Sequence, residues 1–383
     1  MGHELNDIRI KINDIDKKMV ELFEERLTIV SEVAAYKKQN NLKIFDKERE
    51  KEVIKRASSY LKNNEHEKYL NVFMDELMTL CRQYQIDIIK DYGTVQDEKE
   101  TFPEGNSVIG YLGVTGSYSE EAASMHFGEN FTKRAFGHFD EIVNALLKCE
   151  IDVAVLPVEN SSTGTISRVI DLISSNNIYI TGEHISPICH NLLTLPGTKL
   201  TDIKKVYSHH QGLEQSRNFL KQYPWELIEY KSTADSAKLV HDLQDKSIAA
   251  VASHHCAEIY GLEIVVPNIN YENNYTRFIM VGRELTINKS YNKISVAMDI
   301  AHKPGALFNI LRLFKDRNIN LLKIESRPIL GKPWEYLFFF DFEGNLLNDR
   351  IKDLIECLKD AVNDFRILGN YRAYEKNIKN NGI

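Results

Sequence analysis

Proline is absent from residues 1–92, and no part of the chain contains an apolar run of about 18 residues. Proline breaks helices, so its absence permits long helices in the first segment. The missing apolar run argues against a membrane-spanning helix. The opening residues also lack the apolar core of a signal peptide. We therefore expect a cytoplasmic protein with no membrane partner.

Cysteine is sparse, and the five cysteines are scattered along the chain without a CxxC pair. This usage argues against a disulfide framework and against a structural zinc site. The adjacent pairs His209-His210 and His254-His255 also lack the spacing of metal ligands. The glycines follow neither GxGxxG nor a P-loop, and the net charge of -7 leaves no basic footprint for nucleic acid. The sequence thus predicts no metal, no cofactor and no nucleic-acid partner.

Three segments of the chain differ in their residue patterns, and 383 residues are enough for two or three domains. Residues 1–92 read as helix almost throughout. Residues 107–284 alternate short β-branched runs with helical stretches, and residues 293–375 form a compact tail. We therefore predict an all-α domain, an α/β domain and an α+β domain with these boundaries.

The first helical stretch carries an apolar seam whose spacing is typical of a helix that packs against other helices. Arg26 stands where this seam requires an apolar residue. Lys37 follows eleven residues later, about three turns, and so points the same way. Cations on a core-facing stripe are costly unless they meet anions, although a single one can also reach solvent. The seam consists of Leu5, Ile8, Ile12, Ile15, Met19, Leu22, Ile29 and Val33.

Polar residues also interrupt the inner faces of the next two helical stretches. Asp46 occupies an N-cap position, and Arg49 and Glu50 share its face at i+3 and i+4. Gln85 lies one turn beyond Cys81 on the apolar stripe of the third stretch. A buried polar pocket in a helical bundle explains these anomalies together.

With these residues the segment resembles the all-helical chorismate mutases over nearly its whole length. The resemblance implies that arginines hold the two carboxylates of chorismate and that Lys37 and Gln85 donate to its ether oxygen. The reaction is a pericyclic rearrangement, which needs orientation and fixed charge rather than a nucleophile. The family often has serine where this chain has Cys81, so a weak thiol replaces a hydroxyl. The resemblance implies Arg26, Lys37, Glu50 and Gln85 as catalytic residues and Arg9, Asp46, Arg49 and Cys81 as chorismate ligands.

The positions of Arg9 and Lys37 predict the oligomeric state if both serve one pocket. They lie 28 residues apart on one predicted helix. At a rise of ~1.5 Å per residue this is about 42 Å, whereas chorismate is on the order of 10 Å across. No Gly or Pro interrupts the seam to allow a hairpin. Arg9 must then come from a second, antiparallel chain, which predicts a homodimer or a higher even oligomer.

The α/β segment offers hydroxyls and backbone N–H groups at its strand-to-helix junctions, which suit carboxylate binding. One junction reads ENSSTG from Glu159 to Gly164, and another carries Ser208 and Gln211. Together with the TRF triplet that begins at Thr276, these motifs resemble prephenate dehydratase. That family has a two-lobed α/β fold similar to periplasmic binding proteins, with its site in the cleft.

The prephenate dehydratase resemblance implies that Thr276 is essential. Loss of CO2 and a ring hydroxyl requires a proton or hydrogen bond for the leaving hydroxyl. Thr276 is expected to position that hydroxyl or relay a proton, and Glu159 is the other candidate acid if burial raises its pKa. Arg277 is expected to support a carboxylate or the geometry of the site. The implied binding residues are Asn160, Ser161, Thr163, Ser208 and Gln211.

The tail reads strand, helix, strand, strand, helix, strand, the order of a ferredoxin-like α+β unit. Its GAL and ESRP motifs resemble those of ACT domains that bind phenylalanine. The resemblance implies phenylalanine as an allosteric effector. The alternative is a turn glycine and a strand end without any ligand. The implied effector-binding residues are Gly305, Ala306, Leu307, Glu325, Ser326, Arg327 and Pro328.

The three resemblances together imply a bifunctional chorismate mutase–prephenate dehydratase of phenylalanine biosynthesis. Chorismate and prephenate would be its substrates, and phenylalanine would inhibit it. Two other interpretations stay open: a dehydratase whose helical segment only dimerises, and a non-catalytic binding protein. Arogenate also remains possible in place of prephenate.

Overall fold

The computed structural model describes residues 2–40, 42, 46–89, 107–329 and 334–374. The chain divides into two compact units. The first contains the described residues up to 89 together with Leu307–Asn320, and the second contains the remaining described residues. Within these ranges no helix is both long and apolar enough to cross a membrane.

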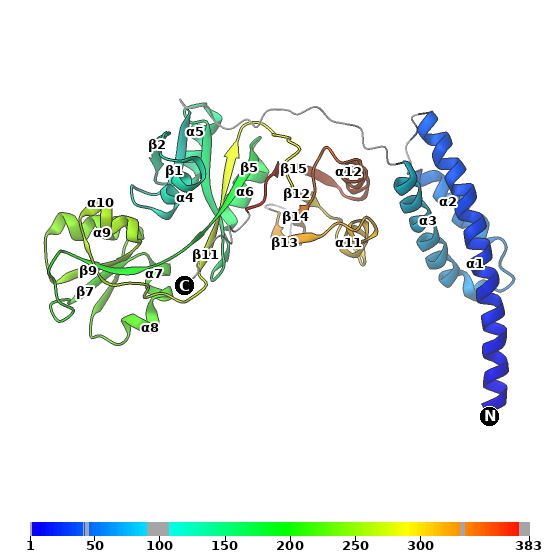
Figure 1. Cartoon of the computed structure of the whole chain (residues 1–383), viewed down its shortest axis with the longest axis horizontal. Coiled ribbons are helices and arrows are strands. Elements are labelled where there is room, and N and C mark those ends of the chain that lie inside the picture. The colour runs from blue at the N-terminus through cyan, green and yellow to red at the C-terminus, as the bar shows by residue number, and fades with distance from the viewer. Residues whose placement is uncertain (1, 41, 43–45, 90–106, 330–333, 375–383) are drawn as a thin grey trace, which may run out of the picture. The chain divides into compact units, whose positions relative to one another are not determined.

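The described N-terminal residues form an all-helical bundle, as predicted (Figure 1). Its elements are α1 (Gly2–Gln39), α2 (Lys47–Ser58), a 3-10 turn (Asn64–His66) and α3 (Glu67–Ile89). α3 packs against both α1 and α2. Asp46 caps α2 as predicted, because its Oδ1 accepts the backbone N–H of Arg49 at 3.0 Å.

The apolar seam predicted on α1 is mostly uncovered within one chain. Ile15 is 56% exposed and Ile29 is 54% exposed. The apolar side chains of α1 that are buried are Val30 and Ala34, because α3 covers the side of α1 that carries Arg26 and these two residues rather than the whole predicted seam. A long apolar surface on α1 therefore has no cover from the described part of its own chain.

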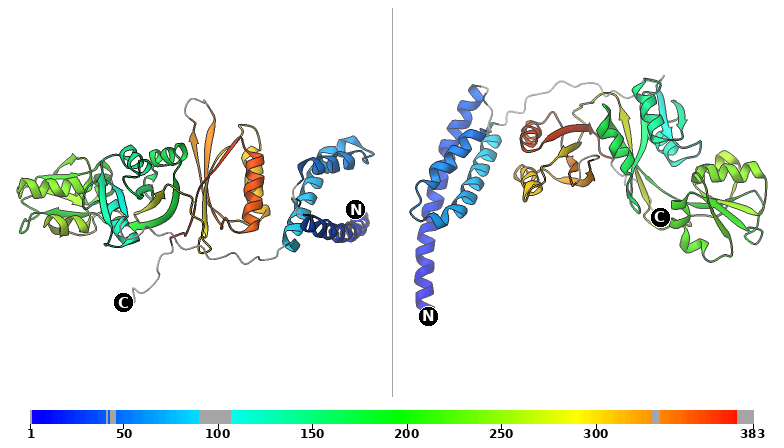
Figure 2. Two further views of the ribbon diagram at one scale, coloured as in Figure 1. Left: turned by 90° about the horizontal axis from the view of Figure 1, so that it is seen from above. Right: turned by 180° about the vertical axis from the view of Figure 1, so that it is seen from behind.

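The second unit contains the two predicted α/β lobes, each built on its own sheet (Figure 2). In the first lobe the sheet order is β5-β11-β3-β1-β2, with β4 paired to β3. Its elements are β1 (Val108–Leu112), α4 (Tyr118–Phe127), β2 (Thr132–Phe136), α5 (Phe139–Leu147), β3 (Val153–Asn160), β4 (Gly164–Thr165), α6 (Ser167–Ser175), β5 (Tyr179–Pro187) and β11 (Tyr275–Gly282).

The second lobe has the sheet order β10-β6-β9-β7-β8 and its own buried core. Buried strands such as β9 read as continuous apolar runs, as expected where helices cover a sheet. Its elements are β6 (Asn191–Thr194), β7 (Lys205–Ser208), α7 (His210–Gln215), α8 (Arg217–Leu220), β8 (Glu226–Glu229), α9 (Thr233–Leu243), β9 (Ile248–Ala252), α10 (His254–Tyr260) and β10 (Glu263–Val266).

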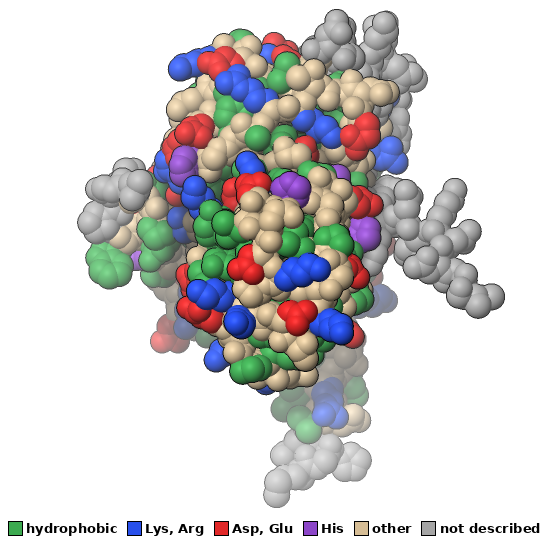
Figure 3. Space-filling model, turned by 90° about the vertical axis from the view of Figure 1, so that its left-hand side faces the viewer, with side chains coloured by type: hydrophobic (Ala, Val, Ile, Leu, Met, Phe, Trp, Pro, Cys, Tyr) green, Lys and Arg blue, Asp and Glu red, His purple; other side chains and the backbone are tan. Residues whose placement is uncertain are grey.

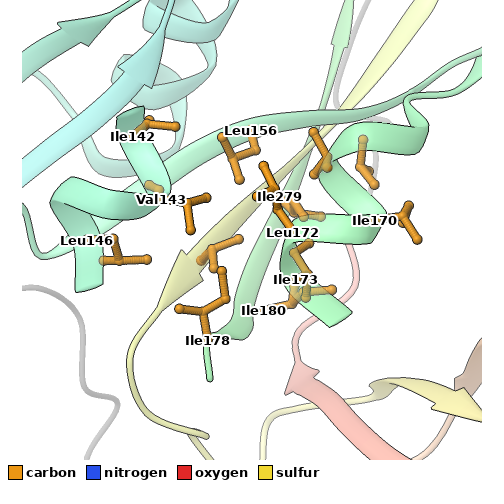
Figure 4. Packing of buried hydrophobic residues seen from close by; sticks show 14 of the residues in the cluster. Ile142, Val143, Leu146, Leu156, Ile170, Leu172, Ile173, Ile178, Ile180 and Ile279 are labelled. Carbon is orange, nitrogen blue, oxygen red and sulfur yellow. The ribbon is translucent and has the colours of Figure 1, made fainter. Parts of the chain in front are cut away.

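Aliphatic side chains from two helices fill the core of the first lobe (Figure 4). Ile142 and Leu146 of α5 and Ile173 of α6 pack with Leu156 of β3 and Ile279 of β11. This core holds β3 and β11 as neighbours. On the face shown in Figure 3, side chains of both charge signs are interspersed and no single-sign patch stands out.

The chain crosses from one lobe to the other and back through two short segments that hydrogen-bond to each other. Asn270 joins them, because its Nδ2 donates to the Ile188 carbonyl at 2.7 Å and its Oδ1 accepts the His190 N–H at 2.8 Å. The Ile188 N–H donates to the Asn274 carbonyl at 2.8 Å. These crossing segments place polar side chains between the lobes.

The tail has the predicted βαββαβ order, and its strands extend the sheet of the first lobe. β15 lies beside β5, where Gly369 is the partner of Ile180. A Cβ at Gly369 would lie 2.3 Å from the Ile180 carbonyl oxygen, so only glycine fits this contact. The sequence did not predict this shared sheet. The elements of the tail are β12 (Lys293–Asp299), α11 (Ala306–Asp316), β13 (Leu321–Pro328), β14 (Tyr336–Glu343), α12 (Asp349–Ala361) and β15 (Asp364–Tyr371).

Candidate functional sites

α1 and α3 bring Arg26 and Cys81 together in the helical bundle. The Arg26 guanidinium donates to Cys81 Sγ at 2.8 Å. Burial raises the pKa of the Cys81 thiol, and nearby Arg26 lowers it to a smaller extent. Gln85 is buried one turn further along α3, and its Oε1 has no partner among the described residues. A buried polar acceptor of this kind has capacity for a ligand.

Lys37 lies near the carboxylates of Asp46 and Glu50 at the end of α1. Burial lowers the pKa of the Lys37 ammonium, and the two carboxylates raise it to a smaller extent. Arg82 of α3 holds Glu50, since its NH1 lies 2.5 and 2.6 Å from the two Glu50 oxygens. The second Arg82 nitrogen donates to Thr79 Oγ1 at 3.1 Å. Cations and carboxylates therefore line the inner faces of all three helices.

Two of the predicted chorismate ligands lie outside this pocket in the single chain. Arg49 is exposed and pairs with Glu52 at 3.1 Å. Arg9 is exposed on α1. The bundle of one chain thus brings Arg26 to Cys81 and Lys37 to Glu50, with Gln85 buried on α3, but neither Arg9 nor Arg49 joins these groups.

Thr276 and Asn160 form the centre of a polar network between the α/β lobes. They face each other on the paired strands β11 and β3. Asn160 Nδ2 donates to Thr276 Oγ1 at 2.9 Å, and Asn160 Oδ1 accepts the backbone N–H groups of Ser162 and Thr163 at 3.0 and 3.2 Å. Because the Thr276 oxygen accepts this bond, its own proton is available to a ligand.

Gln215 of α7 joins this network from the second lobe. Its Oε1 accepts from Asn274 Nδ2 at 3.0 Å, and its Nε2 donates to Ser162 Oγ at 2.8 Å. Asn274 Oδ1 in turn accepts from Asn160 Nδ2 at 2.8 Å. The network therefore connects both lobes to Thr276 through side-chain amides.

Arg277 points away from Thr276 because successive residues of a strand face opposite sides of the sheet. Its Nε lies 2.6 Å from Glu183 of β5, and its NH1 lies 2.6 Å from Asp341 of β14. Its NH2 donates to the Tyr371 hydroxyl at 2.9 Å. Burial opposes ionisation of Asp341, yet Arg277 and Lys293 hold the pKa of its carboxyl below the usual value. Arg277 thus joins β11 to the tail.

Glu159 also lies on the side opposite the Thr276 network. Its carboxylate pairs with Lys323 Nζ at 2.8 Å and lies 3.9 Å from an Arg277 nitrogen. This position argues against Glu159 as the acid of the network, because the neighbouring Asn160 occupies the side that faces Thr276.

The other predicted binding residues of the α/β segment contribute in different ways. Ser208 is fully buried and donates to the Val251 carbonyl at 2.7 Å, so its hydroxyl is used within the lobe. Gln211 is exposed, and Gln215, one turn later, occupies the inner position instead. Ser161 and Thr163 are exposed on the loop after β3, where Ser161 Oγ accepts the Tyr275 N–H at 2.9 Å.

The GAL and ESRP motifs both lie at the ends of elements in the tail. Gly305 has a φ of +79° directly before α11, a conformation that favours glycine. In β13, Glu325 accepts from Thr165 Oγ1 at 3.0 Å and Arg327 lies 3.3 Å from Asp171, so both face the first lobe. Ser326 and Pro328 are exposed on the other side of the strand.

Comparison with known proteins gives a match for each segment. The model for chorismate mutase type II matches residues 8–86, that for prephenate dehydratase matches residues 109–286, and that for the ACT domain matches residues 295–358. The bifunctional chorismate mutase/prephenate dehydratase of Buchnera aphidicola subsp. Acyrthosiphon pisum is 34% identical over 379 residues, 95% of each chain. The chain belongs to the bifunctional chorismate mutase/prephenate dehydratase family.

Solved prephenate dehydratases share the fold of the second and third segments. The structure from Arthrobacter aurescens in complex with L-Phe is 28% identical, has a TM-score of 0.64, and covers 69% of this chain and 89% of that one. The structure from Staphylococcus aureus is also 28% identical, with a TM-score of 0.62, and covers 69% and 99% of the two chains.

Three residues of the two sites, named below, were not predicted as site residues from the sequence. Arg82, which holds Glu50, lies beside the predicted Cys81 and looks like an ordinary surface arginine in the sequence. Asn274 opens the NYTRF motif to which the TRF triplet belongs, but no role was predicted for it, and Gln215 gave no local signal beyond its closeness to Gln211. Among the described residues no cluster of His, Cys, Asp and Glu could hold a metal ion.

Proposed function

We propose that the chain converts chorismate to prephenate in the helical bundle and prephenate to phenylpyruvate between the α/β lobes. The observation that supports this proposal most directly is that one chain holds two separate polar sites. One lies around Lys37 and Glu50, and the other lies around Thr276 and Asn160. The cytoplasmic location and the boundaries of the three domains stay predictions.

The first reaction needs no proton transfer from the protein. The ether C–O bond breaks as a C–C bond forms, and negative charge develops on the ether oxygen. Lys37 and Gln85 are proposed to donate to that oxygen, and Arg26 is proposed to hold a carboxylate. Donors fixed in a partly buried site stabilise such charge without reorganising. Glu50, held by Arg82, is proposed to contact the hydroxyl side of chorismate.

The second reaction consumes one proton. The electron pair of the bond to the departing CO2 enters the ring, which becomes aromatic and expels the hydroxyl as water. Thr276 is proposed to donate its free hydroxyl proton as a hydrogen bond to that leaving group. A threonine is too weak an acid to supply the proton unaided, so it positions the hydroxyl or relays a proton from solvent.

A coupled assay tests both reactions in one experiment. The purified chain receives chorismate, and prephenate and phenylpyruvate are followed separately. Formation of both products from chorismate supports the bifunctional assignment. If the chain forms phenylpyruvate from supplied prephenate but does not convert chorismate, the bundle serves only for dimerisation. A parallel assay with arogenate in place of prephenate shows which of the two the second site prefers as its substrate.

We further propose that two chains pair through α1. Apolar side chains of α1 between Leu5 and Leu22, the seam residues among them, are exposed. An apolar groove of about 620 Å³ lies between α1 and α3, and Arg26 is one of the residues that line it. Removing apolar surface from water contributes roughly 25 cal/mol per Å², against which the entropy lost on association must be set. The groove is lined by Met19, Val20, Leu22, Phe23, Arg26, Phe73, Glu76, Leu77 and Leu80.

Mixing an Arg9→Ala chain with a Lys37→Ala chain should restore about a quarter of the wild-type mutase rate. Half of the dimers are mixed, and one of their two sites then receives both wild-type residues. Mutase activity of each variant and of the refolded mixture is the measurement.

The matched control is a mixture of Arg26→Ala and Lys37→Ala chains. Both residues come from the same chain in the proposed pocket, so every mixed site keeps one defect and no activity should return. Full mutase activity of a monomer at high dilution would contradict the two-chain site.

Phenylalanine is proposed as an effector that binds at the GAL and ESRP motifs. The supporting observations are the ACT match, the L-Phe complex of the Arthrobacter aurescens dehydratase, and the exposed Ser326. The contacts of Glu325 and Lys323 with the first lobe give such a ligand a route to the strand that carries Asn160.

Phenylalanine should inhibit phenylpyruvate formation and raise the unfolding temperature, because a ligand that binds only the folded state stabilises it by mass action. Ser326→Trp, which places a bulky ring on the exposed side of β13, should weaken both effects at equal phenylalanine concentration. Inhibition curves and thermal melts are the measurements. Stronger inhibition by tyrosine than by phenylalanine would contradict the assignment.

A further inference from the structure

Tyr118 and His190 extend the polar network beyond Gln215. His190 is 3% exposed, at the point where the chain leaves the first lobe. Its Nε2 lies 2.9 Å from Gln215 Oε1, and its Nδ1 lies 3.0 Å from the hydroxyl of Tyr118 on α4. The Tyr118 hydroxyl also lies 2.8 Å from the Cys189 carbonyl oxygen. The carbonyl and His190 Nδ1 therefore share the single hydroxyl proton of Tyr118.

The direction of the bonds at Thr276 follows from backbone groups. The Ser162 and Thr163 N–H groups can only donate, so the Asn160 atom that they contact is the oxygen. Asn160 Nδ2 is therefore the donor to Thr276 Oγ1 and to Asn274 Oδ1. Each amide orientation is thus determined rather than arbitrary.

The same reasoning determines the tautomer of His190. Since Asn274 Oδ1 accepts, Asn274 Nδ2 donates to Gln215, and the Gln215 atom that faces it is the oxygen. His190 Nε2 must then carry a hydrogen and donate to that oxygen. Burial lowers the pKa of His190 to about 4, so the ring is neutral near pH 7 and Nδ1 accepts from Tyr118.

We propose that Tyr118 and His190 are positioning residues of the dehydratase reaction, acting through Gln215, Asn274 and Asn160 on the Thr276 hydroxyl. Tyr118 and Asn160 both belong to the first lobe, and the path between them passes through Gln215 of the second. The chain of bonds therefore holds the lobes in one arrangement and keeps the Thr276 proton directed to the substrate. The role rests on the proposed dehydratase function.

His190→Phe should lower the kcat of phenylpyruvate formation about 10- to 100-fold, because a buried amide oxygen loses one donor and the Gln215 orientation relaxes. The KM for prephenate should change less than threefold, since the side chains of Gln215, Asn274 and Asn160 separate His190 from Thr276 along the proposed path. His190→Gln retains an amide nitrogen close to the place of Nε2 and should recover kcat to within about fivefold of wild type.

Tyr118→Phe removes a single hydroxyl and should lower kcat about 3- to 10-fold. The double variant Tyr118→Phe/His190→Phe should be no slower than His190→Phe, because both residues act along one path. His254→Phe, at an exposed histidine of α10, is the matched control and should leave kcat unchanged. Mutase activity and the unfolding temperature of each variant report whether the chain is folded.

Three results would overturn the proposal: wild-type kcat in Tyr118→Phe and His190→Phe, equal losses in His190→Gln and His190→Phe, or additive losses in the double variant. Tyr118→Phe keeps the test decisive if His190→Phe does not fold. Failure of the proposed function looks different, because the wild-type chain would then form no phenylpyruvate from prephenate at all.

Discussion

Thr276→Ala is expected to lower phenylpyruvate formation about 10²- to 10³-fold while chorismate mutase activity persists. Removing one hydrogen-bond donor to an oxygen on which negative charge develops in the transition state raises the activation free energy by about 3–4 kcal/mol. Asn160 Nδ2 keeps two acceptors, the Asn274 side chain and the Tyr275 carbonyl, so the fold should tolerate the loss. Prephenate should accumulate when chorismate is supplied, and separation of the products by chromatography measures it.

Thr276→Ser is the matched control because it retains the hydroxyl and loses only a methyl group. We expect it to keep activity within about tenfold of the wild type. Turnover of Thr276→Ala at a near wild-type rate would place the reacting group elsewhere. Equal loss of activity in the serine and alanine variants would point to packing rather than to the hydroxyl.

Lys37→Ala is expected to lower the mutase rate about 10²- to 10³-fold, equivalent to about 3–4 kcal/mol, and to leave the conversion of supplied prephenate nearly intact. Lys37 faces Asp46 and Glu50 inside the bundle, whereas the next residue, Lys38, is exposed. Lys38→Ala removes an equal charge from the same turn of the helix and should leave both rates unchanged. Parallel loss of both activities in Lys37→Ala would contradict two independent sites.

The pH profile gives a second measure of Lys37. Its pKa is lowered by burial, so the ammonium loses its proton at a lower pH than an ordinary lysine, whose pKa is about 10.4. The mutase rate should therefore decline on the alkaline side before a free lysine would titrate. An unchanged mutase rate up to the ordinary lysine pKa would argue against the ammonium as the donor.

Apolar periodicity is encoded locally, and it predicted the helical bundle, the α/β domain and the βαββαβ tail. The two lobes of the α/β domain followed only from the resemblance to prephenate dehydratase. The sequence placed Arg26 and Lys37 on the inner side of the first helix, and the structure agrees. It did not show which face of that helix α3 covers. Periodicity within one segment therefore could not reveal that most of the long seam on α1 stays uncovered in a single chain.

A sequence motif does not by itself tell which side of a sheet each of its residues faces. Thr276 and Arg277 belong to one triplet, yet the pleat sends their side chains to opposite sides of β11. The same holds for Glu159 and Asn160 of β3. The period of two was readable in the sequence and would have separated these pairs. The contacts of Gln215 were not readable, because its partners lie far away along the chain, among them Ser162 and Asn274.

The shared sheet makes the order of synthesis matter. β5 leaves the ribosome long before β15, so the edge of β5 that pairs with β15 stays unpaired until β15 is made. An open edge of this kind is a template for pairing with other chains. A chain that stops short of β15 would keep that open edge and would leave Arg277 without Tyr371. A chain that lacks the whole tail would also lose Asp341 as a partner of Arg277. Removal of the tail should therefore make this chain aggregate, rather than give a soluble enzyme that has only lost its inhibition by phenylalanine.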